Sequence, residues 1–242
     1  MNVFGLTDMG KVRQTNQDSF KIVQMDDLYL LVVCDGMGGA NGGKTASSNA
    51  VDAFVCSAAI KIDAAGSDKD KYEKALRDAV ADANKKVYEM SGESADLAGM
   101  GTTLCAALTD SERIWAVSVG DSRIYKFVRG RINQISHDHS YVQALLDSGS
   151  ITVAESKNHP NKNIITRAVG TQEEVECDSF LMKFDMDGLL LCSDGLTNFV
   201  SDSELNKIFK QNNSAEDTAK AYIDAANAAG GGDNITAIVI KK

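Results

Sequence analysis

LYLLVVCDGMGG, residues 28–39, places seven apolar or aromatic residues directly before Asp35. A short apolar run of this kind is typical of a strand that is buried on both faces. Asp35 comes where such a strand would end, and Gly36 lets the backbone approach a ligand because it has no Cβ. The stretch therefore predicts a buried central strand with a carboxylate at its end.

The same pattern recurs at three further aspartates. GLLLCSDG (188–195) reaches Asp194, IWAVSVGDS (114–122) reaches Asp121, and GGGDNITAIVI places Asp233 before a strand-like run. An isolated Asp-Gly after a strand is usually only a turn. Four carboxylates at strand edges, each beside glycine or a small polar residue, instead predict one acidic cluster.

Length and composition fit a single domain over residues 1–242. The net charge of −9 argues against a nucleic-acid partner and suits a protein that holds divalent cations. Five cysteines without a C-x-x-C pair predict buried, reduced thiols. The apolar runs are about strand length, and the N-terminus has no signal-peptide pattern, so we expect a cytoplasmic protein without a membrane partner.

Strand-like and helix-like periodicities predict antiparallel sheets covered by helices. Four runs between residues 102 and 135 are joined by short turns, which favour antiparallel hairpins. The order of elements is not the regular alternation of a doubly wound sheet. Strands are also expected at 2–8, 18–24, 174–184, 188–193 and in the C-terminal run, and helices at 45–60, 70–90, 139–149, 201–211 and 215–230.

Three segments carry more specific expectations. The helix over 70–90 should bury an apolar stripe made of Tyr72, Leu76, Ala79, Ala83 and Val87. GMGGANGGK (36–44) is expected as a glycine-rich loop. Residues 150–165 are polar and without a clear period, so we expect a mobile flap near the site.

The residue types of the acidic cluster indicate metal-assisted chemistry on phosphate. Carboxylates and backbone carbonyls without histidine or cysteine partners favour Mg²⁺ or Mn²⁺. Two cations that share Asp35 would remove the repulsion between carboxylates and make a bridging water a nucleophile for attack on phosphorus. Arg13 is a candidate for binding two phosphate oxygens, and Asp18 could hold a metal-bound water.

A second interpretation is a nucleotide hydrolase with a phosphate-binding P-loop. GGANGGKT (38–45) matches G-x-x-x-x-G-K-S/T, follows a strand and precedes a helix. Against it, Asp35, Gly36 and Met37 separate the strand from the first loop glycine, and the order is not serial parallel βαβ. Such an enzyme would need Lys44 to bind ATP or GTP.

The three histidines give no sign of a catalytic triad. His137, His139 and His159 are expected at the surface or in loops, because no Ser-His-Asp spacing or G-x-S-x-G elbow accompanies them. Met37 and Met100 are expected to be packing residues.

Eight motifs occur in an order that resembles the bacterial branch of the type-2C metal-dependent serine/threonine protein phosphatases. They are GKVRQTNQDS, CDGMGG, GTT, VGDSR, DHS, ITRAVG, LCSDGL and GGDNIT, and they cover essentially the whole chain. The resemblance implies an α+β fold, a β-sandwich of two antiparallel sheets flanked by α-helices in four layers. It also implies a monomeric enzyme in which water attacks phosphoserine or phosphothreonine directly, without a phosphoenzyme.

The resemblance assigns roles motif by motif. Asp35 would bridge two ions of Mn²⁺ or Mg²⁺, the Gly36 carbonyl would bind one of them, and Asp194 and Asp233 would complete the second. Asp121, together with Asp194, matches a third metal site described for bacterial members. The arginine of the first motif, Arg13, matches the phosphate-binding arginine of the family.

The partners implied are phosphorylated proteins and a eukaryotic-like Ser/Thr kinase whose action the enzyme opposes. Three positions depart from the family pattern: Gln17 stands where many members have glutamate, Met37 where animal members have histidine, and Lys44 where glutamate is frequent. Gln17 keeps a non-catalytic relative open as an alternative. A related phosphatase that acts on anti-sigma-factor antagonists is another, although such proteins usually carry sensor domains.

Overall fold

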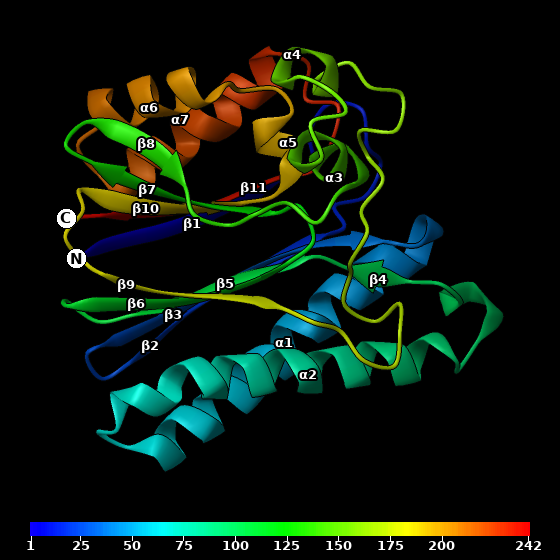
Figure 1. The fold of residues 1–242 in the computed structure, drawn as a ribbon, viewed down its shortest axis with the longest axis horizontal. Helices are drawn as coiled ribbons and strands as arrows, with labels where there is room; N and C mark the ends of the chain where they lie inside the picture. The colour runs from blue at the N-terminus through cyan, green and yellow to red at the C-terminus, as the bar shows by residue number, and fades with distance from the viewer.

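Two antiparallel β-sheets lie face to face in the computed structural model, which describes residues 1–242 except for the side chain of Ala40 (Figure 1). The first sheet has the order β1-β11-β10-β7-β8, and its strands are β1 (Asn2–Asp8), β11 (Ile235–Lys241), β10 (Gly188–Cys192), β7 (Arg123–Val128) and β8 (Arg131–Gln134). The second has the order β2-β3-β5-β6-β9, and its strands are β2 (Asp18–Met25), β3 (Leu28–Met37), β5 (Leu104–Thr109), β6 (Arg113–Val119) and β9 (Asp178–Lys183), with β4 (Gly101–Thr102) paired to β3.

Helices cover the outer face of each sheet, so the α+β sandwich that the sequence predicts is confirmed (Figure 1). The second sheet is covered by α1 (Gly39–Ala65) and α2 (Tyr72–Ser91), and the first by α6 (Asp202–Gln211) and α7 (Ala215–Ala228). The short elements are α3 (Tyr141–Asp147), α4 (Val153–Ser156), α5 (Asp194–Thr197), η1 (Lys69–Lys71) and η2 (Ala95–Leu97). Helices α3, α4 and α5 gather at the end of the sandwich away from the chain termini (Figure 1).

Strand β3 is the central strand that the opening stretch predicts. Its residues from Leu30 to Cys34 are fully buried. Alternate side chains of a strand point to opposite faces of the sheet, and both faces of this strand are covered. Leu30, Val32 and Cys34 pack toward α1 and α2, whereas Leu31 and Val33 pack between the two sheets.

Helix α2 buries every member of the predicted apolar stripe, from Tyr72 to Val87. Among the described residues, no helix combines the length and the apolar character needed to cross a bilayer.

Several local predictions are wrong for identifiable reasons. Strand β3 continues past Asp35 to Met37, and α1 begins at Gly39, inside the segment expected as a loop. The helix can start there because Gly43 packs against Gly36: a Cβ on Gly36 would lie 1.9 Å from the Gly43 carbonyl oxygen. Tertiary packing thus outweighs the low helix propensity of glycine.

The middle of the chain differs from a series of hairpins. Strands β5 and β6 form a hairpin, as do β7 and β8, but β6 and β7 belong to different sheets. Gly120–Ser122 is therefore a crossover between the sheets, and Gly120 has φ of +97°. Its positive φ and its close approach to Thr103 both require glycine.

Three further expectations need correction. His139 lies in a loop, one of the two expected places, but it is not at the surface: 7% of it is exposed, because it packs against the crossover. The segment 150–165 contains helix α4, which Thr152 and Glu155 cap reciprocally. Cys56 is exposed, whereas Cys34 is buried as predicted.

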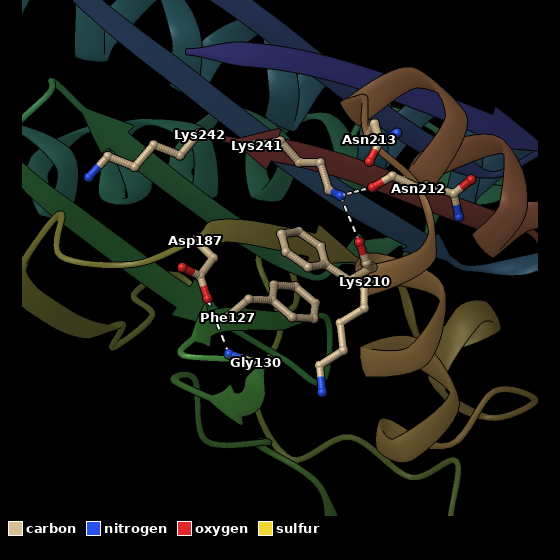
Figure 2. Close-up of a pocket in the computed structure, with 9 residues that line it drawn as sticks. Phe127, Gly130, Asp187, Lys210, Asn212, Asn213, Lys241 and Lys242 are labelled. Carbon is tan, nitrogen blue, oxygen red and sulfur yellow. Dashed lines mark hydrogen bonds between the residues drawn. The ribbon is translucent and has the colours of Figure 1, made fainter.

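The end of the sandwich near the termini contains a small cavity of about 270 Å³. Figure 2 shows Lys241 there, directed at the end of α6, with Lys242 pointing away from it. The Lys241 ammonium donates to the carbonyl oxygens of Phe209 and Asn212 and lies 4.2 Å from the centre of the Phe209 ring.

Candidate metal centre

The predicted aspartates all lie near one end of the sandwich, opposite the Lys241 cavity. Asp18 begins β2 and pairs directly with Asp35 of β3. Asp194 begins α5 just after β10, and Asp233 lies two residues before β11. Asp121 lies in the crossover that follows β6. Strand ends from both sheets thus supply these side chains.

The charges of the other four site aspartates all act on the carboxyl group of Asp35. Burial raises its pKa well above the usual value, and the charges of Asp18, Asp194, Asp121 and Asp233 raise it further. Such a mutual effect requires the carboxylates to be close.

The backbone around Asp35 is firmly held. Its N–H donates to Thr103 Oγ1 at 2.9 Å, and its carbonyl oxygen accepts from the Thr103 N–H and from Thr102 Oγ1. The GTT motif therefore positions the end of β3.

Asp18 is almost completely buried, with 1% of its surface exposed. Its Oδ2 accepts hydrogen bonds from Ser193 Oγ at 2.7 Å and from Thr236 Oγ1 at 2.6 Å. Its Oδ1 is buried and accepts no hydrogen bond from any described residue. Burial raises its pKa to about 6, although the two hydroxyl groups act in the opposite direction.

Asp194 shows the same imbalance. Its Oδ2 accepts from the Asn198 amide at 2.8 Å, whereas its Oδ1 is buried without a partner among the described residues. Burial raises its pKa, and the charge of Asp233 raises it further.

Asp121 faces the same site from the crossover. Burial raises its pKa to about 7, and the charges of Asp194 and Asp138 act in the same direction. Together with Asp194, it lines a cavity of about 1100 Å³ that extends under the segment 150–165.

Arg13 and Asp233 contact each other at the exposed edge of the site. Arg13 Nη2 donates to Asp233 Oδ2 at 2.8 Å, and 51% of the Arg13 side chain is exposed. The other carboxylate oxygen of Asp233 accepts from the Asn234 N–H. The hydrogen bond to Asp233 raises the pKa of Arg13, so the guanidinium remains charged.

Gly36 and Gln17 shape the backbone beside Asp35. The Gly36 N–H donates to the Gln17 carbonyl oxygen at 3.2 Å, and the Gln17 amide donates to the Gly39 carbonyl oxygen at 2.7 Å. A glutamate at position 17 could not donate that second bond, because an ionised carboxylate has no hydrogen to give. Glutamine therefore serves a structural role here.

These residues fit divalent cations. The donor set contains only oxygen atoms of carboxylates and the Gly36 carbonyl, which hard cations prefer. The buried, unpartnered oxygens of Asp18 and Asp194 have unused capacity for a positive ligand. Among the described residues, no three acidic, histidine or cysteine side chains are already gathered in a metal-binding arrangement. Cation binding would therefore require these carboxylates to adjust.

The P-loop interpretation is wrong. Strand β3 is antiparallel to both of its neighbours, β2 and β5, so no parallel βαβ unit surrounds the glycines. Lys44 Nζ donates to the Asp18 carbonyl oxygen at 3.0 Å and to Ser19 Oγ at 3.2 Å. Lys44 thus ties α1 to β2.

Residues 10–228 match the model of a family described as protein phosphatase 2C. The chain is 39% identical over 238 residues to the serine/threonine phosphatase stp of Listeria welshimeri, which covers 98% of this chain and 94% of that protein. The chain therefore belongs to the protein phosphatase 2C family. A second relative, the protein phosphatase PhpP of Streptococcus pneumoniae serotype 2, is 36% identical over 245 residues, with 99% and 97% covered.

Solved structures of bacterial phosphatases resemble the fold of this type-2C phosphatase over nearly its whole length. The serine/threonine phosphatase Stp1 from Staphylococcus aureus has a TM-score of 0.91 at 34% identity, covering 100% of this chain and 95% of that one. PstP/Ppp of Mycobacterium tuberculosis has a TM-score of 0.87 at 34% identity, with 98% and 96% covered. The family consists of metal-dependent serine/threonine protein phosphatases, so the prediction of a phosphoprotein phosphatase is confirmed.

Proposed function

We propose that this type-2C phosphatase hydrolyses phosphoserine and phosphothreonine in proteins with two Mn²⁺ or Mg²⁺ ions, and that a third ion binds beside them. Asp35 would contact two ions, the Gly36 carbonyl oxygen one of them, and Asp194 and Asp233 the second. Asp121 would hold the third ion together with Asp194. The supporting observation is the group of strand-edge carboxylates, two of which, Asp18 and Asp194, have a buried oxygen without a partner among the described residues.

The chain's own residues would bind and orient the reactants. When bound, the cations would supply the Lewis acidity that activates water for attack on phosphorus. Arg13 uses one nitrogen on Asp233 and keeps further N–H donors on an exposed guanidinium, which suits two phosphate oxygens. Ser193 and Thr236 fix one oxygen of Asp18, which leaves the other to orient a water molecule.

The cellular setting is a further part of the proposal. The named relatives are bacterial phosphatases, and we propose that this enzyme opposes a Ser/Thr kinase of the same cell. Residues 1–242 would act as one catalytic domain, monomeric and cytoplasmic, on phosphorylated protein substrates. A pull-down of its phosphoprotein substrates, with and without the kinase gene, tests this part.

The segment 150–165 would shape access to the Asp121 side of the site and the choice of substrate. Thr152, Lys157 and Lys162 line the same cavity as Asp121 and Asp194. Shortening the segment should change the preference among phosphopeptides with different flanking residues. An unchanged preference would contradict this role.

The test is hydrolysis of a phosphothreonine peptide and of p-nitrophenyl phosphate with Mn²⁺, with EDTA and with Asp194→Ala. We expect turnover with Mn²⁺ that disappears in EDTA and in the variant. Asp224→Ala removes an exposed carboxylate of α7 and is the matched control. Absence of turnover from folded, Mn²⁺-loaded protein would instead favour a non-catalytic relative.

A further inference from the structure

Asp121 lies in a crossover that two neighbouring residues of another segment hold from both sides. His139 contacts Gly120, the residue before Asp121, and Asp138 contacts Arg123, two residues after it. Asp138 and His139 follow β8 in the chain and are joined to the crossover in sequence through the β7–β8 hairpin. The arrangement resembles a clamp with Asp121 between its two contacts.

His139 and Gly120 are joined by two hydrogen bonds. The Gly120 N–H donates to His139 Nδ1 at 3.0 Å, and the His139 N–H donates to the Gly120 carbonyl oxygen at 2.9 Å. Both groups are buried, so water cannot readily replace the imidazole as acceptor. Because Nδ1 accepts a backbone hydrogen bond, the ring must be neutral with its hydrogen on Nε2.

The carboxylate of Asp178 favours that tautomer. Nε2 lies 3.2 Å from Asp178 Oδ2, which can accept its hydrogen. Arg167 lies on the same side, 3.1 Å from Nε2, and also contacts Asp178 Oδ1. Burial lowers the pKa of His139, and the Arg167 charge lowers it further.

The rest of the crossover is held to the Asp35 strand. Thr103 Oγ1 accepts from the Asp35 N–H and lies 2.7 Å from Ser122 Oγ. Arg123 donates to both carboxylate oxygens of Asp138 at 2.9 to 3.0 Å from Nε. The residues that flank Asp121 are thus fixed relative to Asp35, and His139 supplies the buried contact on the Gly120 side.

We propose that His139 is a positioning residue for Asp121, and that its Nδ1 acceptor sets the affinity of the metal site that Asp121 helps to form. This inference rests on the proposed function, which places a third ion at Asp121 and Asp194. His139 touches no reacting group. It acts by keeping the Gly120 peptide in the orientation that turns the Asp121 carboxylate toward Asp194.

The test compares four variants by Mn²⁺ calorimetry, by kcat and KM for p-nitrophenyl phosphate, and by hydrogen exchange of the Gly120 amide. Asp121→Asn removes the ligand, and His139→Leu removes the acceptor at similar size. His139→Asn keeps an acceptor near the Nδ1 position, whereas His139→Gln moves its amide toward Asp178. The Asn and Gln pair decides the question if the Leu variant does not fold.

We expect Asp121→Asn to lose one Mn²⁺ site. His139→Leu and His139→Gln should bind Mn²⁺ at that site about tenfold more weakly, the lower end of the range for partners behind a metal ligand. The Gly120 amide should exchange faster in both, and His139→Asn should restore both properties. The stronger sites should keep their affinity, so the loss should appear in the Mn²⁺ dependence of kcat.

Three results would overturn the inference, each in a different way. If Asp121→Asn loses a site and both His139→Leu and His139→Gln keep it at unchanged affinity, His139 does not position Asp121. Equal impairment of the Asn and Gln variants would show that ring shape, not the acceptor, matters. If Asp121→Asn itself keeps every site, the third-ion part of the proposed function fails, and the inference fails with it.

Discussion

Strands β10 and β11 pair along the sandwich, between its two ends (Figure 1). The buried charged groups at these two ends have different partners. At the carboxylate end, formed by the five site aspartates, Asp18 and Asp194 each bury an oxygen without a partner among the described residues. At the lysine end, the last residue of β11, Lys241, is also buried, but its ammonium donates to two carbonyl oxygens at the end of α6 (Figure 2).

The comparison distinguishes the charge of Lys241, which stabilises the fold, from the charges of Asp18 and Asp194, which have the capacity to bind a cation. The carbonyl groups at a helix C-terminus carry partial negative charge, so Lys241 needs no carboxylate to be stable there. The unpartnered oxygens of Asp18 and Asp194 have no such compensation, and burial makes the ionised forms of these two carboxylates unfavourable. A ligand of positive charge would stabilise the ionised carboxylates at this end.

Removing the central carboxylate should have the largest effect. Asp35→Asn should lower turnover of p-nitrophenyl phosphate by at least about a hundredfold, since two of the proposed ions would bind to Asp35. In the wild type, Mn²⁺ at a hundred times its dissociation constant should raise the free energy of unfolding by about 2.7 kcal/mol. Thermal melts with and without Mn²⁺ should show that this gain disappears in the variant.

Asp224→Ala is again the control, and its Mn²⁺ response should equal that of the wild type. If Asp35→Asn keeps the full Mn²⁺ stabilisation, the cations bind elsewhere and the carboxylate end is not a metal centre.

Replacing the buried lysine should affect stability alone. Lys241→Met leaves the carbonyl oxygens of Phe209 and Asn212 without their donor, which should lower the free energy of unfolding by about 1–3 kcal/mol. Urea titration measures this loss, and kcat and KM should not change. Lys242→Met alters an exposed side chain and should change stability by less than about 0.5 kcal/mol.

A changed kcat in folded Lys241→Met protein would show that the two ends communicate and would break the distinction drawn above.

A conservative substitution at the carboxylate end should raise the free energy of unfolding, whereas Lys241→Met should lower it. Asp18→Asn keeps an acceptor for Ser193 and Thr236 and removes a buried charge that lies among other carboxylates. Metal-free protein should become more stable by about 1–2 kcal/mol at pH 7, as seen for sites where function costs stability. The measurement is urea unfolding in EDTA.

With saturating Mn²⁺ the gain of Asp18→Asn should shrink or reverse. A loss of stability in EDTA would mean that the ionised carboxylate is already satisfied in the metal-free protein.

The sequence locates the aspartates well because each lies beside a strongly apolar run. Such runs predict strand edges, and Asp35, Asp121, Asp194 and Asp233 all lie at or next to strand ends in the structure. The resemblance of the motifs added the family, which the comparisons confirm.

Features that depend on contacts between distant segments could not be predicted in the same way. The turn after β6 is short enough for a hairpin, yet it crosses between sheets. Gly120 has a positive φ there, but a glycine in the sequence does not by itself indicate a crossover. The burial of His139 could not be predicted because its partner, the Gly120 N–H, is 19 residues away. The DHS motif was the available signal, but by itself it does not identify that partner.

Asp110 is a buried aspartate outside the metal site, and comparing it with Asp18 leads to a prediction about the pH dependence of stability. Asp110 follows β5 at the end of the second sheet away from Asp35, and 5% of its surface is exposed. Burial alone would raise its pKa, but Lys69 Nζ at 2.6 Å and the N–H groups of Glu112 and Arg113 outweigh it, so the pKa is lowered. Asp18 is also buried, and its pKa moves the other way.

The smallest effect on the free energy of unfolding is therefore expected for a substitution of Asp110. It should appear only at pH values where the Asp110 carboxylate is ionised. A carboxylate whose pKa is lowered by folding stabilises the protein above its unfolded value, about 3.9, and loses this contribution as pH falls through the folded value. Asp110→Asn should cost about 1 kcal/mol at pH 6, and the difference from wild type should vanish as pH falls below about 4. Unfolding in urea from pH 6 to pH 3 measures it, with Asp224→Asn as the exposed control. A difference that stays constant over this range would show that Asp110 acts through its shape and not through its charge.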